Sequence, residues 1–298
     1  MASVTKPLAL TVNNTNVAAS TYPAYSSGAT YAKGANAKAT NAADGLVYEY
    51  ESLADDNTGN PLTDPTWWLN LGPCNRDAMF DSRTSTVTTG SGDIVVTVSP
   101  GEFFDTITLL NIQDSTGVSV SVDRGATNLY SDTQSLSEDV TSWYDFFFSP
   151  LGEQETKAVW NQEVFYSDAT VTVTVSGTTP SVGLLLIGRA REIALTEYGA
   201  SIGIEDYSTK ETDQWGRTLL IEREYADTAD VKMVLDTGQV DAIRRTLADL
   251  RATPALYNLN NEGSRFQSLV IFGKYDDFSI DIAYHTTAYC TLRLTGLL

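Results

Sequence analysis

The stretch ATVTVTVSGTTPSVGLLLIG, residues 169–188, decides the fold class. In its first half Val171, Val173 and Val175 alternate with threonines, the period-two pattern of an antiparallel strand with one face in the core and one in water. Its second half, VGLLLIG at 182–188, is apolar but far too short to cross a bilayer. Glycine, serine and proline separate the two halves. The stretch therefore predicts strands of a packed β domain and no membrane insertion.

Similar segments surround this stretch. Between residues 83 and 190 lie STVTT, DIVVTVS, FFDTITLLN and GVSVSVD, each rich in β-branched residues and bounded by turn residues. Several short strands at this spacing predict an antiparallel β-sandwich or jelly roll over residues 76–195. The aromatic-rich segment SWYDFFFSPLGEQETKAVW (142–160) interrupts the pattern. We expect it to be a long excursion over the edge of the sandwich.

The last hundred residues predict an α+β domain over 196–298 that contains one prominent helix at about 238–252. The helix is predicted from an apolar stripe with three- and four-residue steps, namely Val240, Ile243, Leu247 and Leu250. Thr237 is the expected N-cap, and Pro254 is expected to end the helix. Strands are expected at Thr218–Tyr225 and Val231–Leu235 before the helix, and at SLVIFG, FSIDIAY and CTLRLTGLL after it.

The N-terminal quarter is less regular. Residues 1–45 are rich in small residues and predict either an extended arm or the start of a small module. Residues 46–75 continue that module with LVYEYESL, where Tyr48 and Tyr50 share one strand face. The turn-rich NTGNPLTDPT then leads to Trp67 and Trp68. By alternation one tryptophan should point inward and the other outward, so a sugar-stacking platform, a subunit contact and a core plug all remain open.

Composition sets further bounds. At 298 residues the chain exceeds the usual size of one domain, so two or three domains are expected. Thirty-eight acidic and 19 basic residues give a net charge of −19, which opposes binding to phosphate backbones, so no nucleic-acid partner is expected. No secretory signal is apparent at the N-terminus. Cys74 and Cys290 are isolated, which suits a reducing cytosol, and nothing in the sequence supports a disulfide between them.

Residue types that carry catalysis are scarce. His285 is the only histidine, and its closeness to Cys290 in sequence does not make a thiol–imidazole pair, because folds assemble such pairs from distant segments. One histidine and two separated cysteines cannot form a structural zinc site. We therefore expect no enzyme activity, no cofactor and no metal. Two carboxylates across a cleft, as glycoside hydrolysis requires, remain an alternative because the sequence does not show which acids meet.

An ordered aromatic pattern runs through residues 25–72. It comprises Tyr25, Tyr31-Ala-Lys-Gly34, Val47-Tyr48, Tyr50-Glu51-Ser52-Leu53, Asn60-Pro61 and Trp67-Trp68. This order resembles the small aromatic module attached to chitinases, with its Y-x-x-G…V-Y…Y…P…W pattern. In that family exposed aromatic residues stack on sugar rings, which implies carbohydrate binding by Tyr48, Tyr50, Trp67 and Trp68. The sequence departs from the family at Ala35, where aspartate is usual.

A second resemblance covers roughly residues 45–298. Its blocks are DPTWWLNLGPCNRDAMFDSRTSTV, SWYDFFFSP, EYGASIGIEDYSTKETDQWGRT, LADLRATPALYN and FGKYDDFSIDIAYHTTAYCTLRLTGLL. Together they resemble a family of tailed-bacteriophage virion proteins that are encoded among tail and structural genes. The family more usually reads P-T-N-R-W where this chain has Pro73-Cys74-Asn75-Arg76-Asp77. An indole is missing there, so the contact that it makes in relatives should be remodelled.

This second resemblance implies a structural subunit of the tail, neck or baseplate, made in the bacterial host cytoplasm and located in the virion. Its partners would be other tail proteins and copies of itself, in symmetric oligomers that could anchor fibres. Candidate interface residues are Trp143, Tyr144, Phe146, Phe147 and Phe148, of which we assign about half to cores. Two alternatives remain, a glycan-binding module for host attachment and a polysaccharide depolymerase.

Overall fold

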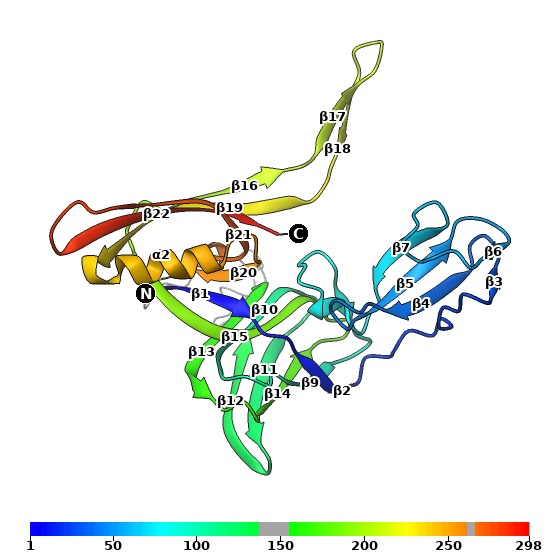
Figure 1. Cartoon of the computed structure of the whole chain (residues 1–298), viewed down its shortest axis with the longest axis horizontal. Coiled ribbons are helices and arrows are strands. Elements are labelled where there is room, and N and C mark those ends of the chain that lie inside the picture. Colours follow the sequence, from blue (N-terminus) through cyan, green and yellow to red (C-terminus); the bar gives the residue numbers. More distant parts are fainter. Residues whose placement is uncertain (137–154, 261–265, 298) are drawn as a thin grey trace, which may run out of the picture.

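The computed structural model describes residues 1–136, 155–260 and 266–297. In this part the chain is mainly β, with antiparallel sheets and one α-helix (Figure 1). The expected mainly-β class and the one prominent helix are thus confirmed. The largest sheet has ten strands, and a five-stranded sheet, a three-stranded sheet and two two-stranded sheets accompany it.

Six strands of the largest sheet close into an antiparallel barrel. In order around the ring they are β15 (Ser181–Thr196), β1 (Ala2–Pro7), β20 (Ala255–Asn258), β21 (Val270–Asp281), β22 (Thr287–Gly296) and β19 (Tyr225–Asp236). The ring closes where Leu195 and Thr196 of β15 pair with Val234 and Met233 of β19. Closure leaves no free edge at this seam, which removes a route to unwanted strand pairing.

The helix α2 (Val240–Asp249) follows a 3-10 turn, η2 (Thr237–Gln239). Its stripe is buried at Ile243, Leu247 and Leu250 and packs with Met233 and Leu292 in the barrel core. The prediction that Thr237 caps the start of this helical segment was wrong, because Asp236 takes that role. The carboxylate of Asp236 accepts a 2.7 Å hydrogen bond from the Gly238 N–H, whereas the Thr237 hydroxyl donates to the His285 carbonyl at 2.8 Å.

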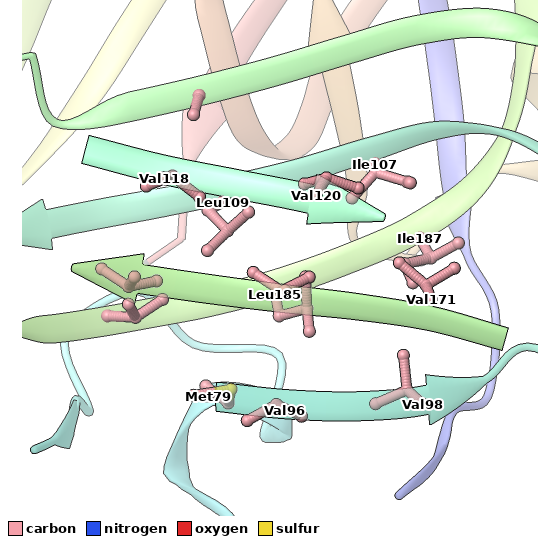
Figure 2. Packing of buried hydrophobic residues seen from close by; sticks show 14 of the residues in the cluster. Met79, Val96, Val98, Ile107, Leu109, Val118, Val120, Val171, Leu185 and Ile187 are labelled. Carbon is pink, nitrogen blue, oxygen red and sulfur yellow. The ribbon is translucent and has the colours of Figure 1, made fainter. Parts of the chain in front are cut away.

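The five-stranded sheet packs on the remaining part of the ten-stranded sheet. Its strands, in order, are β12 (Thr127–Ser135), β11 (Gly117–Arg124), β14 (Thr170–Ser176), β9 (Ile94–Ser99) and β2 (Thr11–Thr15). Opposite lie β13 (Lys157–Phe165), β10 (Phe104–Gln113) and the first half of β15. Figure 2 shows their shared core, where Val96, Val98, Val118, Val120 and Val171 lie near Ile107, Leu109, Leu185 and Ile187. The stretch at 169–188 thus supplies one strand to each of the two packed sheets.

Strand β15 belongs to two cores. Its first half contributes Leu185 and Ile187 to the core between the sheets, and its second half contributes Ile193 and Ala194 to the barrel core. Gly188 lies between the halves, where a Cβ atom would meet the Lys6 carbonyl oxygen at 2.4 Å. The division expected near residue 195 therefore differs from the structure, because one continuous strand serves both sides.

Of the two expectations for residues 1–45, an extended arm or a run of small-residue strands and turns, the structure shows the second. Residues 2–7 form β1 inside the barrel wall, and residues 11–15 form β2 at the edge of the five-stranded sheet. The C-terminal region 196–298 therefore does not enclose the barrel alone. Small residues such as Ala2 and Ser3 gave no periodic signal, but they are buried because strands flank them on both sides.

The remaining elements are short. They are β3 (Thr30–Tyr31), β4 (Asn36–Thr40), β5 (Val47–Ser52), β6 (Asn57–Thr58), β7 (Trp68–Pro73), η1 (Ala78–Phe80), β8 (Thr88–Thr89), β16 (Ser201–Asp206), β17 (Thr209–Thr212), β18 (Thr218–Ile221) and η3 (Gln267–Leu269). The sheets β4-β5-β7 and β3-β6 build the aromatic module at residues 25–73. Strands β16, β17 and β18 build a projecting hairpin (Figure 1).

Candidate interaction surfaces

The aromatic module is organised around Trp68. Its side chain is 2% exposed and lies in T-shaped contact with Tyr25 and Tyr31, at centroid distances of 5.7 and 4.9 Å. The indole N–H donates to the Asn60 carbonyl at 3.2 Å. Ala37 completes the buried part of this core. Trp68 therefore plugs the module core, and its rings have no open face for a sugar.

The other three sugar-binding candidates are half-buried. Trp67 and Tyr50 pack against the core around Trp68, so part of each ring is taken up by the module itself. The hydroxyl of Tyr48 donates to the Asp44 carboxylate at 3.0 Å. Burial, with the hydrogen bond to Asp44, raises the pKa of Tyr48. The expectation of one inward tryptophan fits Trp68, and Trp67 keeps part of its ring in water.

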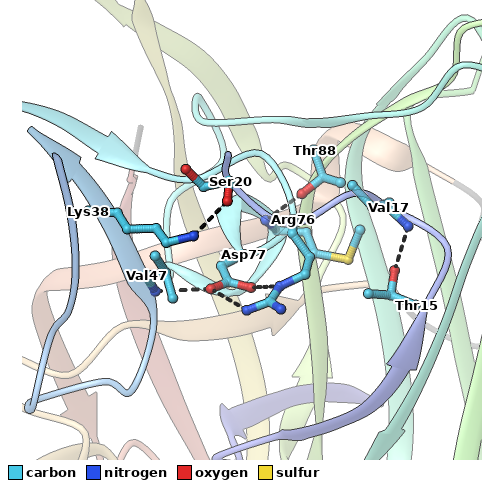
Figure 3. Close-up of polar contacts among 9 residues, drawn as sticks. Thr15, Val17, Ser20, Lys38, Val47, Arg76, Asp77 and Thr88 are labelled. Carbon is cyan, nitrogen blue, oxygen red and sulfur yellow. Dashed lines mark hydrogen bonds and ion pairs between the residues drawn. The ribbon is translucent and has the colours of Figure 1, made fainter. Parts of the chain in front are cut away.

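A buried carboxylate joins β5 of the module to the segment before η1 (Figure 3). Asp77 accepts from the Val47 N–H at 2.9 Å and from the Arg76 guanidinium at 2.7 and 3.2 Å. The hydrogen bond from Arg76 to Asp77 is the main cause of the raised pKa of Arg76. Close by, the Thr88 hydroxyl accepts from the Met79 N–H at 2.9 Å. The segment at residues 76–79 thus forms a polar junction whose buried carboxylate is satisfied.

Acidic side chains near this junction are held by local hydrogen bonds. Burial raises the pKa of Asp81, although the Thr86 hydroxyl donates to it at 2.6 Å and the Arg83 N–H at 2.9 Å. Asp44 adds to that rise and also receives the Tyr48 hydroxyl. Asp81 and Asp44 therefore stabilise the local structure at the base of the module through these hydrogen bonds.

The remaining chemical candidates lie apart. Cys74 and Cys290 are both buried free thiols, and burial raises the pKa of Cys290 to about 11. His285 is exposed and its carbonyl binds Thr237, whereas Cys290 faces the barrel core, so no thiol–imidazole pair forms.

Across residues 1–136, 155–260 and 266–297, no three His, Cys, Asp or Glu side chains gather as metal ligands. In the same part of the chain no helix has the length and apolar character to span a bilayer.

The expected interface residues Trp143, Tyr144, Phe146, Phe147 and Phe148 lie outside the described residues. The structure shows another surface that the sequence did not single out. We call residues 201–225, which comprise β16, β17, β18 and the first residue of β19, the arm. It projects from the barrel wall as a long two-stranded hairpin (Figure 1).

The arm exposes large apolar side chains. They are Ile202, Ile204, Tyr207, Trp215, Leu219, Leu220 and Tyr225. Trp215 and Leu220 are each 74% exposed, and all six residues of β16 are exposed. Hydrophobic periodicity identifies strands that have one buried face, so it did not indicate this surface, where both faces of β16 are exposed.

A second surface is a cavity of about 860 Å³ beside β1 and β15, which we call the basic pocket. Its lining includes Lys6, Arg189 and Arg191, with Leu8, Phe103 and Leu250. Glu102 and Asp249 also line it, so basic residues exceed acidic ones by one. This excess is local, because the whole chain carries a net charge of −19.

Comparison of the chain with protein-family models, with curated proteins and with solved structures found no match.

Proposed function

We propose that this protein is a structural subunit of a tailed-bacteriophage virion, located in the tail, neck or baseplate, and that it acts through contacts with other tail proteins and with copies of itself. The observation that carries this proposal is the arm. The proposed role requires no cofactor and no catalytic group. We read the two facing sheets as the sandwich expected from the sequence, and the barrel with its helix as the body from which the arm projects.

The arm is a surface that needs a partner. An isolated two-stranded hairpin is only marginally stable in water, because it has no core of its own. The arm nevertheless holds Trp215, Leu219 and Leu220 in the open. Soluble monomers rarely expose many large apolar groups together, and aromatic residues are enriched at protein interfaces. Burial against another subunit would remove this apolar surface from water and fix the hairpin.

The sequence resemblance points to the same segment. The block EYGASIGIEDYSTKETDQWGRT spans residues 197–218 and so covers β16, β17 and the turn at the tip of the arm. At that turn the Asp213 carboxylate accepts from the Trp215 and Arg217 N–H groups at 2.9 and 2.8 Å. These hydrogen bonds fix the turn and hold Trp215 exposed at the tip of the arm, as a specific contact with a partner requires.

Shortening the arm tests the proposal. Residues 208–223 are replaced by Asn-Gly, which joins Tyr207 to Glu224 through a two-residue turn, because the Tyr207 N–H already bonds the Glu224 carbonyl at 3.3 Å. We expect an unchanged melting temperature for the barrel, loss of oligomers in sedimentation velocity, and absence of the shortened protein from purified virions by mass spectrometry. Incorporation at the wild-type copy number would contradict the proposal.

A glycan-binding role in host attachment is the second candidate, favoured by the partly exposed rings of Tyr48, Tyr50 and Trp67. Aromatic faces can stack on the apolar faces of sugar rings. Under this alternative, Trp67→Ala would abolish binding on an array of host surface glycans and leave the melting temperature nearly unchanged. Release of reducing sugars from capsule or lipopolysaccharide would instead indicate a depolymerase, which would need two carboxylates across a cleft.

A further inference from the structure

The basic pocket contains an unusual pairing of like charges. Lys6 of β1 lies directly opposite Arg189 of β15 in the antiparallel register. Arg191 follows two residues later along β15 and also lines the pocket. Like charges directly opposite each other on neighbouring strands are destabilising. The repulsion between Lys6 and Arg189 therefore destabilises the pairing locally, and a bound anionic partner would offset it.

None of the three cations has an ion pair within the described part of the chain. Arg76, Arg124, Lys157, Lys274 and Arg293 each lie within 4.0 Å of an aspartate oxygen. Lys6, Arg189 and Arg191 have no such neighbour among the described residues, although acidic residues outnumber basic ones two to one in the sequence. Glu102 and Asp249 also line the pocket, so its net charge is one positive charge, and the three cations remain without an ion pair in the described residues.

The pocket also has an apolar side. Phe103 is 54% exposed at its rim, and Leu8 and Leu250 contribute to the lining. A ligand that fits this site combines acidic groups with an apolar or aromatic group. A free inorganic anion would satisfy the cations and leave the apolar side in water.

The arm has this chemistry. Residues 201–225 contain six acidic residues, Glu205, Asp206, Glu211, Asp213, Glu222 and Glu224, against the basic residues Lys210, Arg217 and Arg223. In the described structure no ion pair ties any of them to another side chain. The acidic groups flank Trp215, Leu219 and Leu220, which are all exposed. The arm and the pocket are therefore complementary in net charge and in apolar character.

The arm cannot fill the pocket of its own chain. It projects from the β16 and β19 side of the barrel, and its tip points away from β1 (Figure 1). We infer that the arm of one copy docks in the basic pocket of a second copy, with its carboxylates on Lys6, Arg189 and Arg191 and with Trp215 against Phe103. Such a head-to-tail contact joins two different surfaces, so it builds a ring when the rotation closes and a filament when it does not. This inference rests on the proposed structural role and names the partner surface.

Charge reversal on each side tests the contact. The pocket variant carries Arg189→Glu and Arg191→Glu, and the arm variant carries Glu211→Lys and Glu222→Lys in the full chain. Among the described residues neither carboxylate takes part in the turn hydrogen bonds of Asp213 or in an ion pair, so the arm should keep its fold. We expect each variant to raise the apparent dissociation constant of self-association about tenfold or more, measured by mass photometry and sedimentation velocity.

Mixing the two variants gives the decisive result. The acidic arm of the pocket variant fits the basic pocket of the arm variant, and the basic arm of the arm variant fits the acidic pocket of the pocket variant, so mixing restores charge complementarity. We expect the mixture to assemble although neither variant assembles alone, and a chain carrying all four changes to regain self-association through the reversed charges. Raising the salt concentration should weaken wild-type assembly, because screening shortens the range of the attraction.

Matched controls change charge elsewhere. Lys33→Glu in the aromatic module and Glu163→Lys on β13 each alter an exposed residue by two charge units, the step made at each position of the test variants, and we expect wild-type assembly from both. Wild-type assembly by the pocket variant, or a mixture that stays monomeric, would overturn the inference. If the shortened arm abolishes assembly while the pocket variant assembles normally, the structural role stands and the arm docks elsewhere. A wild-type chain that is monomeric at every concentration and absent from virions would overturn both.

Discussion

At the scale of single residues, two neighbouring tryptophans have different tasks. Trp68 is enclosed by Tyr25 and Tyr31, with its N–H bonded to Asn60, whereas Trp67 lies at the edge of the same core. Replacing a buried tryptophan by alanine removes a large apolar surface and leaves a cavity. Trp67 and Trp68 are adjacent in sequence, but only Trp68 is fully buried.

We predict that Trp68→Ala destabilises the module by about 3–5 kcal/mol, the usual cost of deleting a large buried ring. Trp67→Ala should cost about 1 kcal/mol, because much of its surface is not enclosed. Chemical denaturation followed by near-ultraviolet circular dichroism of the module's aromatic residues separates the two. Equal losses for both variants would show that Trp67 belongs to the core as fully as Trp68.

At the scale of elements, the junction of the aromatic module depends on one carboxylate. Asp77 is 4% exposed and bonds both the Val47 N–H at the start of β5 and the Arg76 side chain. Removing it leaves the Val47 N–H without its partner, and hydrogen bonds to charged groups contribute about 1.5–3 kcal/mol. Strand β5 would then lose the contact that fixes its first residue to the segment before η1.

Asp77→Ala should therefore lower the free energy of unfolding by about 2 kcal/mol and increase hydrogen exchange at the Val47 amide by a large factor. Asp77→Asn is the matched control, because its amide oxygen can still accept from Val47. We expect its exchange rate at Val47 to lie between those of the wild type and Asp77→Ala. Unchanged protection of this amide in Asp77→Ala would show that the junction is held by other contacts.

The elements that could be predicted from sequence are those with one buried face. Val171, Val173 and Val175 alternate because only one side of β14 meets the core, and α2 shows a stripe for the same reason. In β16 Ile202 and Ile204 alternate with small and polar residues, but both faces of the strand are in water, so the alternation marks no core-facing side. In the candidate sites, Trp67 and Trp68 could be recognised as a pair, but their different burial depends on Tyr25 and Tyr31, which come from earlier segments.

At the scale of the whole molecule, pairing between distant segments decides the architecture. β1 lies between β15 and β20, which are more than 170 residues later in the chain, and nothing in its local sequence indicates those neighbours. The basic pocket arises from the same pairing, since Lys6 and Arg189 meet only when β1 is in place. Closure of the barrel and formation of the basic pocket thus both depend on the pairing of β1 with β15.

Deleting residues 2–7 should consequently open the barrel. The deletion removes the strand hydrogen bonds to β15 and β20 and the buried side chains Ala2 and Val4, and leaves two unpaired edges that favour aggregation. We expect loss of the cooperative barrel transition in calorimetry, while the core between the two sheets keeps its own. A synthetic peptide of residues 1–8 added in trans should restore the transition, and the same peptide with Val4→Asp should not, because it would bury an unpaired carboxylate. A truncated chain that melts like the wild type without peptide would show that the ring does not depend on β1.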